Sequence, residues 1–280
     1  MKITVASVVY EKALSFLDDF IVSLQAQDCH KFDVLLINDN IPSDLLVDRL
    51  KTNNMSLADR IHIVDKSKHG LLPFALRIEL LLEALAHGTE LLILVDCDDI
   101  AKSDRVSKIV QQYDEKYDFF YNDIFLFDGM NAMPPLPKVT DDISYLLEQN
   151  YLGFSNCAIN LRHIKKSYIE SLRDGKTQIF DWYLFSRMLL SGMTGKYIDN
   201  TGTYYRIYEN NTAGIPNYTL NELEKEKQIK LKHYHLLRKY DSRYKKLIEI
   251  YENLDLSKRT IEAEKKGYYW WGMISEWRDE

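Results

Sequence analysis

Apolar positions follow two alternating patterns over the first hundred residues. Four segments are short and rich in apolar residues, as is typical of strands buried on both faces: 2–9, 32–39, 60–65 and 90–96. Three longer segments between them carry apolar residues at a spacing of three or four, as amphipathic helices do: 13–27, 43–54 and 73–88. This alternation predicts an α/β domain with a mainly parallel central sheet and helices on both faces.

The patterns after residue 100 are less regular. We expect, in chain order, a helix over 103–113, a strand within 117–129, a strand and then a helix over 153–172, a helix over 178–192 and one or two strands within 196–210. From residue 219 the chain is charged, rich in tyrosine and helical in pattern. The sequence therefore predicts an α/β domain over 1–218 and a helical C-terminal extension over 219–280.

A cluster of aspartates follows the fourth predicted strand, at Asp96, Asp98 and Asp99. One aspartate would suffice to cap the next helix, and neighbouring negative charges repel one another, so folding alone does not explain three. Open α/β sheets bind ligands beyond the carboxyl ends of their strands, and Asn38 and Asp39 end the second strand there. Carboxylates in such a crevice suit Mg²⁺ or Mn²⁺ that shares its coordination shell with substrate phosphates.

Composition narrows the class of protein. The chain has 280 residues, a net charge of −6 and a pI near 5.7, which argues against a nucleic-acid binder. Its three cysteines, Cys29, Cys97 and Cys157, lack the spacing of a disulfide framework or a zinc site. No apolar run reaches the roughly 20 residues of a membrane span, and the N-terminus begins directly with a strand pattern. We therefore expect a cytoplasmic protein.

Other motifs for phosphate binding or catalysis are absent from the sequence. No GxGxxG follows the first predicted strand, and SGMTGKY at 191–197 has the wrong glycine spacing for a P-loop. Neither HExxH nor GxSxG occurs. Because His233 and His235 have no cluster of partner ligands nearby in the sequence, we expect both to be solvated rather than bound to a metal.

The order of five segments carries a resemblance to a known family. These segments are ITVASVVYEKALSFLDDFIVSLQAQ, FDVLLINDN, ALRIELLLEALAHGTELLILVDCDD, IFDWYLFSRMLLSG and YYRIYENNTAG. In this order they resemble the family 2 glycosyltransferases of GT-A fold, over roughly residues 1–214. The resemblance implies metal-dependent, inverting transfer of a sugar from a nucleoside-diphosphate sugar, with 1–100 as the nucleotide-binding half and 101–218 as the acceptor half.

The resemblance also implies roles for residues of the first half. Val8 and Val9 would lie in the loop after the first strand, which cradles the nucleotide base. Asp39 would contact the uracil or the ribose, and Arg77 would lie near the nucleotide. Asp96 would face the ribose as the first member of the DxD pair.

Further roles follow from the same resemblance. Asp98 would bind the metal as the second member of the DxD pair, and Asp99, the acid that follows it, is a candidate for substrate binding. Asp181 matches the aspartate that supplies the catalytic base. Tyr208 stands where the family frequently has a histidine.

Asp181 also has a physical argument of its own. The acceptor hydroxyl must lose its proton as it attacks the sugar, and a carboxylate within hydrogen-bond reach typically contributes about 10² to 10⁴ in rate. Such a base should lie across the crevice from the metal, on the acceptor side, and Asp181 opens a predicted helix in the second half of the chain. The structural alternative is that its side chain only caps that helix.

Three further residues are candidates for substrate binding, each with a structural alternative. Trp182 could form the floor of an acceptor site, because aromatic faces pack against sugar C–H groups, or it could belong to the core. Asn156 could line the pocket or belong to the start of a strand. Arg206, with the loop up to 214, could close over the diphosphate or simply form a turn.

These observations favour a hexosyltransferase that uses Mn²⁺ or Mg²⁺ and moves a sugar from a UDP-sugar or another nucleotide sugar to a hydroxyl of a glycan or lipid-linked glycan. The C-terminal helices are candidates for peripheral contact with the inner membrane face or for a homodimer contact. Two alternatives stay open. One is a nucleotidyltransferase, and the other is a non-catalytic module that binds a glycan or a nucleotide sugar.

Overall fold

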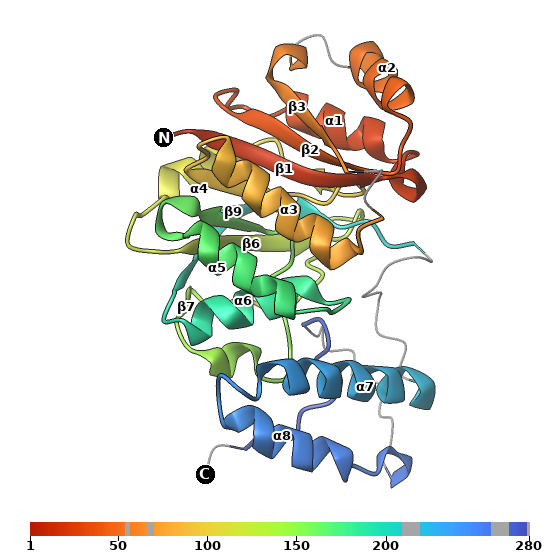
Figure 1. The fold of residues 1–280 in the computed structure, drawn as a ribbon, viewed down its shortest axis with the longest axis vertical. Coiled ribbons are helices and arrows are strands. Elements are labelled where there is room, and N and C mark those ends of the chain that lie inside the picture. Colours follow the sequence, from red (N-terminus) through yellow and green to blue (C-terminus); the bar gives the residue numbers. More distant parts are fainter. Residues whose placement is uncertain (54–56, 67–69, 209–218, 259–268, 279–280) are drawn as a thin grey trace.

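The computed structural model describes residues 1–53, 57–66, 70–208, 219–258 and 269–278. Figure 1 shows an α/β body that contains the N-terminus and a pair of helices, α7 and α8, packed against one end of it. No described helix is both long enough and apolar enough to cross a membrane.

The central sheet is mixed. Its strands follow the order β3-β2-β1-β4-β8-β6-β9-β5, with β7 paired to β9. In chain order these strands are β1 Ile3–Tyr10, β2 Asp33–Asp39, β3 Ile61–Asp65, β4 Leu91–Leu94, β5 Ile100–Ala101, β6 Phe119–Phe125, β7 Val139–Thr140, β8 Cys157–Asn160 and β9 Gly195–Tyr204. The four strands predicted in the first half pair in parallel, and β8 lies antiparallel between β4 and β6.

Helices cover both faces of the sheet, as the sequence predicts. They are α1 Leu17–Gln25, α2 Ser43–Asn53, α3 Pro73–Ala86, α4 Arg105–Gln112, α5 Lys166–Ser171, α6 Phe180–Leu190, α7 Leu220–Leu237 and α8 Arg243–Glu252. Residues of α1, α2 and α4 pack in one hydrophobic cluster, and residues of α3, α5 and α6 pack in another. The predicted α/β class is therefore confirmed.

Short 3₁₀ helices lie between these elements. They span Glu11–Ala13, Ala58–Arg60, Ile143–Leu146, Leu161–His163, Leu172–Asp174 and Leu256–Lys258. The first of them corrects the prediction of one helix over 13–27, since the α-helix begins only at Leu17. It also corrects the predicted loop at Val8 and Val9, because β1 continues to Tyr10 before the chain turns.

The helices α7 and α8 share a hydrophobic cluster with α6. Trp182 of α6 and His233 of α7 stack with ring centroids 4.1 Å apart and an interplanar angle of 24°. His233 is fully buried, which contradicts the prediction that it is solvated, and this burial lowers its pKa to about 3. The imidazole is therefore neutral at physiological pH and acts as an aromatic ring in the core. His235, two residues on, is exposed as expected.

Candidate active site

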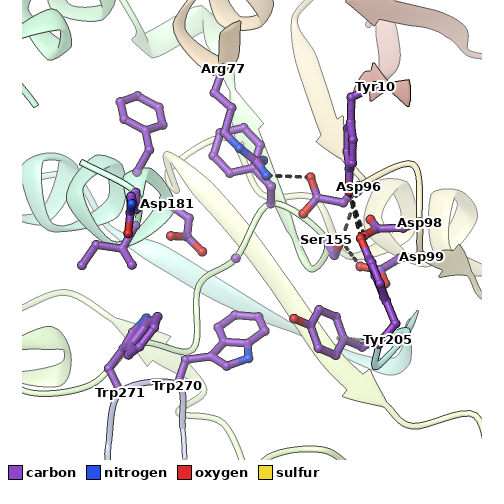
Figure 2. Close-up of a pocket in the computed structure, with 16 residues that line it drawn as sticks. Tyr10, Arg77, Asp96, Asp98, Asp99, Ser155, Asp181, Tyr205, Trp270 and Trp271 are labelled. Carbon is purple, nitrogen blue, oxygen red and sulfur yellow. Dashed lines mark hydrogen bonds and ion pairs between the residues drawn. The ribbon is translucent and has the colours of Figure 1, made fainter. Parts of the chain in front are cut away.

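A pocket of about 160 Å³ lies beyond the carboxyl ends of β1 and β4. This is where open α/β sheets place their ligands. Its walls bring together Asp96, Asp98 and Asp99 from the turn after β4, Arg77 from α3 and Asp181 from α6. Figure 2 shows the aspartate cluster on one side of the pocket and Asp181 on the other. The convergence of these distant segments is the central feature of the site.

Asp96 is held by an arginine from the neighbouring helix. Its Oδ1 lies 3.0 Å from Nη2 of Arg77, and the guanidinium of Arg77 stacks over the Phe154 ring at 4.0 Å from the centroid. The backbone N–H of Asp96 donates to Ser155 Oγ at 3.1 Å. Burial raises the pKa of Asp96, and the arginine charge opposes that shift. Arg77 and Asp96 thus form a preorganised ion pair in the wall of the pocket.

Asp98 carries the carboxylate best suited to a divalent cation. Its side chain is partly exposed to the pocket, and its Oδ2 accepts from the Tyr208 hydroxyl at 2.6 Å and from the Tyr10 hydroxyl at 3.1 Å. The two tyrosines thus converge on one oxygen of the carboxylate. Within the described part of the chain, no group of three or more carboxylates, imidazoles or thiolates converges closely enough to hold a metal ion. A single protein carboxylate, together with ligand oxygens and water, matches the way Mg²⁺ is commonly bound beside phosphates.

Asp99 and Arg206 fasten the turn of the aspartate cluster to the segment that follows β9. Asp99 is 1% exposed, and it accepts from Ser155 Oγ and, at 2.8 Å, from the backbone N–H of Arg206. Burial raises its pKa, and Asp98 and Asp96 raise it further.

The Arg206 guanidinium donates to the Asp98 carbonyl oxygen at 2.9 Å and pairs with Asp19 at 2.8 Å. The guanidinium also lies over the aromatic rings of Phe16 and Phe127, which flank it. The rest of the loop predicted to close on a donor, 209–214, lies outside the described residues.

Asp181 is the second residue of α6, and its carboxylate points into the pocket (Figure 2). The backbone N–H of Trp182 donates to its Oδ1 at 2.8 Å. Burial raises the pKa of Asp181 to about 6, although the nearby charge of Arg77 opposes the shift. A carboxylate with this pKa is ionised at pH 7 and has enough basicity to accept a proton from a hydroxyl as it reacts.

Two predicted substrate-binding residues are instead part of the core. Trp182 is fully buried, and its indole N–H donates to the Leu146 carbonyl oxygen at 2.8 Å. Asn156 is also fully buried, and its amide donates to the carbonyl oxygens of Asn122 and Tyr151. Both side chains are thus satisfied inside the protein and do not line the pocket, so the structural alternative applies to each of them rather than substrate binding.

The residues predicted to contact the nucleotide base or the ribose, Val8, Val9 and Asp39, lie in β1 and β2. Val9 is buried in the core and Val8 is partly exposed, both within β1. Asp39 ends β2 and is partly exposed, and burial raises its pKa. Asn40 follows it with a φ of 66°, a left-handed conformation that asparagine tolerates better than most residues. None of these residues is among those that line the pocket.

Several residues of the pocket were not expected from the sequence. Tyr10 and Tyr205 line it, and so do Trp270 and Trp271 from the C-terminal end of the chain. The two tryptophans lie in the conspicuously aromatic run YYWWGMISEW. Such a run suggests a docking segment, but nothing in it indicates where it docks.

Comparisons with known proteins support the fold. No protein-family model and no curated protein matches the sequence. TarS residues 1–349 from S. aureus, in complex with UDP-GlcNAc, matches with a TM-score of 0.55 and 14% identity over 92% of this chain and 77% of that one. The mannosyltransferase PcManGT from Pyrobaculum calidifontis, in complex with GDP-Man and Mn²⁺, matches with a TM-score of 0.55 and 13% identity over 90% and 68%.

A third similar structure is GalNAc-T7 with UDP, GalNAc and Mn²⁺. It matches with a TM-score of 0.56 and 12% identity, over 91% of this chain and 52% of that one. All three likenesses extend over nine tenths or more of the present chain. The chain therefore has the GT-A fold, as the order of its motifs predicts.

Proposed function

We propose that this protein is a metal-dependent, inverting glycosyltransferase that takes a sugar from a nucleoside-diphosphate sugar, with a UDP-sugar as the first candidate. The observation that carries the proposal is the pairing, in one pocket, of the acidic turn after β4 with Asp181 on the opposite wall. The structures similar to this chain were solved with UDP, UDP-GlcNAc or GDP-Man, which supports the same class of donor.

The donor diphosphate would lie against the aspartate cluster. Asp98 would hold Mn²⁺ or Mg²⁺ there, since its carboxylate is partly exposed and hard oxygen ligands suit either ion. When bound, such a cation neutralises the charge that develops on the departing diphosphate. Asp96, fixed by Arg77, would face the ribose, and the nucleotide base would extend toward Asp39 at the end of β2.

Asp181 would act as the general base. The acceptor oxygen forms a bond to the anomeric carbon while the bond from that carbon to the diphosphate oxygen breaks. Because attack comes from the face opposite the leaving group, the anomeric configuration inverts. The hydroxyl proton passes to the Asp181 carboxylate, whose raised pKa of about 6 suits this transfer.

The acceptor is proposed to be a hydroxyl of a glycan or a lipid-linked glycan. The nucleotide-binding half, 1–100, supplies the aspartate cluster, and the acceptor half, 101–218, supplies Asp181. We propose a cytoplasmic location, with the C-terminal helices as the region for contact with a membrane surface or a second copy of the chain. A nucleotide-sugar-binding module without activity would have no use for a carboxylate of raised pKa in the pocket wall across from the aspartate cluster.

Two variants test the proposal with UDP, GDP and their sugars as probes. Asp98→Asn should abolish the Mn²⁺-dependent rise in melting temperature that the nucleotide produces, because the carboxylate charge that binds the cation is lost. Asp181→Asn should keep that rise but reduce release of the nucleoside diphosphate from the nucleotide sugar by about 10²-fold or more.

Asp141→Asn is the matched control, since Asp141 is exposed and lies away from the pocket. It should behave as the wild type in both measurements. A wild-type protein that gains no stability from any of these nucleotides with Mn²⁺ would refute the transferase proposal. Unchanged turnover in Asp181→Asn would refute the role of the base alone.

A further inference from the structure

We propose that Trp270 and Trp271 form the acceptor platform of the pocket and that the group bound there is an uncharged pyranose ring. This inference rests on the proposed function. It assigns to the C-terminal end of the chain a part of the active site, and it assigns the acceptor a chemical class. The argument follows from where the two indoles lie, how they are held there and which charges surround them.

The two tryptophans line the pocket away from the aspartate cluster. Figure 2 shows Trp270 and Trp271 on the side of the pocket opposite Arg77 and away from the aspartate cluster. The nucleotide and its diphosphate need the aspartate side, where the ends of β1 and β4 lie. The side with Asp181 and the indoles is therefore the one left for the acceptor, whose hydroxyl must reach the base.

The position of the Trp270 ring is built into the backbone beneath it. A Cβ atom placed on Gly153 would lie 2.6 Å from both Cη2 and Cζ3 of that ring, so only glycine allows the indole to lie this close to the chain. The Tyr205 ring stands on another side, with its centroid 5.9 Å from that of Trp270. The backbone N–H of Asn150 also donates to the Trp270 carbonyl oxygen at 2.8 Å.

Two buried glutamates anchor the segment that carries the tryptophans. Glu226 of α7 is 1% exposed and accepts from the backbone N–H groups of Met273 and Ile274, the latter at 2.8 Å. Glu148 is 7% exposed and accepts from the backbone N–H groups of Glu276 and Trp277, both at 2.7 Å. Burying a carboxylate costs free energy unless it is hydrogen-bonded. Here the hydrogen bonds to the two carboxylates hold a segment without regular secondary structure in one place.

The anchored segment buries one side chain and leaves the indoles open to the pocket. Ile274 is fully buried, whereas Trp270 and Trp271 are only partly buried. Trp271 has a φ of 60°, a left-handed conformation that is strained for a bulky residue. Core packing alone would not require a strained tryptophan at a pocket wall. A ligand-binding role explains both the strain and the exposure.

The charges around the pocket select an uncharged ligand on this side. Among its described lining residues, Arg77 is the one cation, whereas four are aspartates; Nη2 of Arg77 pairs with Asp96, and its Nη1 is buried without a hydrogen-bond partner. An anionic acceptor group beside the indoles would therefore face a pocket with four aspartates and a single guanidinium, which lies on the opposite side. A pyranose presents C–H groups on its faces and hydroxyls at its rim, so it can stack on an indole and offer a hydroxyl to Asp181.

Saturation-transfer NMR with simple pyranosides tests the proposal. The probes are the methyl β-glycosides of glucose, galactose and N-acetylglucosamine, added to the full chain with UDP and the diamagnetic Mg²⁺. We expect transfer to the C–H protons of one ring face for at least one probe. Trp270→Ala should weaken its binding about tenfold, as expected for the loss of one well-packed aromatic contact.

Trp277→Ala is the matched control, because Trp277 lies in the same anchored segment but outside the pocket. It should bind the probe as the wild type does. Gly153→Ala keeps every indole but must displace the Trp270 ring. It should therefore lower the affinity for the pyranoside probe, as Trp270→Ala does. Equal affinity in wild type, Trp270→Ala and Gly153→Ala, or no transfer to any of the three probes, would overturn the proposal.

Nucleotide binding separates this failure from that of the proposed function. If only the platform is wrong, UDP with Mn²⁺ still raises the melting temperature of the wild type and of Trp277→Ala. If the proposed function is wrong, either neither protein responds to any nucleotide or nucleotide sugar with Mn²⁺, or both respond but release no nucleoside diphosphate from any nucleotide sugar. If the nucleotide still raises the melting temperature but pyranoside affinity is the same in the wild type and Trp270→Ala, only the proposed platform is refuted.

Discussion

Asp181 shows at the scale of one residue how a reactive group opposes folding. Its pKa is raised to about 6 in the folded chain, from an ordinary value near 3.8, mainly because the side chain is buried. The folded state therefore prefers the protonated form, and this preference favours folding below pH 3.8 and is lost as the pH rises through 6. At neutral pH the ionised carboxylate destabilises the fold.

Replacing Asp181 by asparagine should for this reason stabilise the protein at pH 7.5. A pKa shift of about two corresponds to at most about 3 kcal/mol in the free energy of unfolding, and the gain should be smaller at pH 5. Urea unfolding at both pH values measures it, with Asp141→Asn as the control that changes neither. A stability loss at pH 7.5 would show that the carboxylate is not under such strain.

At the scale of elements, the C-terminal segment 269–278 is held by acceptors rather than by a regular structure of its own. Glu148 illustrates this: besides the two backbone N–H groups it accepts from Tyr251 Oη and, at 3.0 Å, from Ser275 Oγ. The carboxylate therefore joins α8, the C-terminal segment and the loop before β8. Without the charge, several buried donors would compete for a single amide oxygen.

Glu148→Gln should lower the free energy of unfolding by about 2 kcal/mol, because hydrogen bonds to a charged acceptor are replaced by fewer and weaker ones. Denaturant unfolding followed by circular dichroism measures the loss. Glu249→Gln, at an exposed position of α8, is the matched control and should be neutral. A change below about 0.5 kcal/mol in Glu148→Gln would contradict this reading of the anchor.

At the scale of the whole molecule, the α/β body and the C-terminal helices share one hydrophobic cluster. It contains Leu184 of α6 together with Tyr234 of α7, Leu247 of α8 and Ile274 of the C-terminal segment. Figure 1 shows the two C-terminal helices beside the end of the body that carries α6. Elements that share a core in this way are expected to unfold together.

Leu247→Ala should therefore move a single unfolding transition for the whole chain. Loss of a fully buried leucine side chain typically costs about 2–5 kcal/mol, and the midpoint should fall equally by far-UV circular dichroism and by tryptophan fluorescence. Ile250→Ala, at a site 36% exposed on the same helix, should have a much smaller effect. Two separate transitions in Leu247→Ala would mean that the C-terminal helices fold on their own.

The α/β class, the positions of most helices and strands and the acidic turn of the site follow from local properties of the sequence. Alternating apolar patterns specify elements, and the carboxyl ends of parallel strands must meet at one edge, so Asp96 and Asp98 could be placed there without a structure. Burial of individual aromatic side chains could not be read in this way. The sequence around Trp182 and around His233 does not indicate whether each side chain faces solvent, a ligand or the core.

Only the tertiary structure brought the C-terminal tryptophans to the pocket. Trp270 and Asp98 are separated by 172 positions, and no periodicity links segments so distant. Their proximity depends on Gly153, which leaves room for an indole, and on buried carboxylates that hydrogen-bond the backbone of the C-terminal segment. Local pattern determines which elements form, while contacts between distant elements decide which side chains share a cavity.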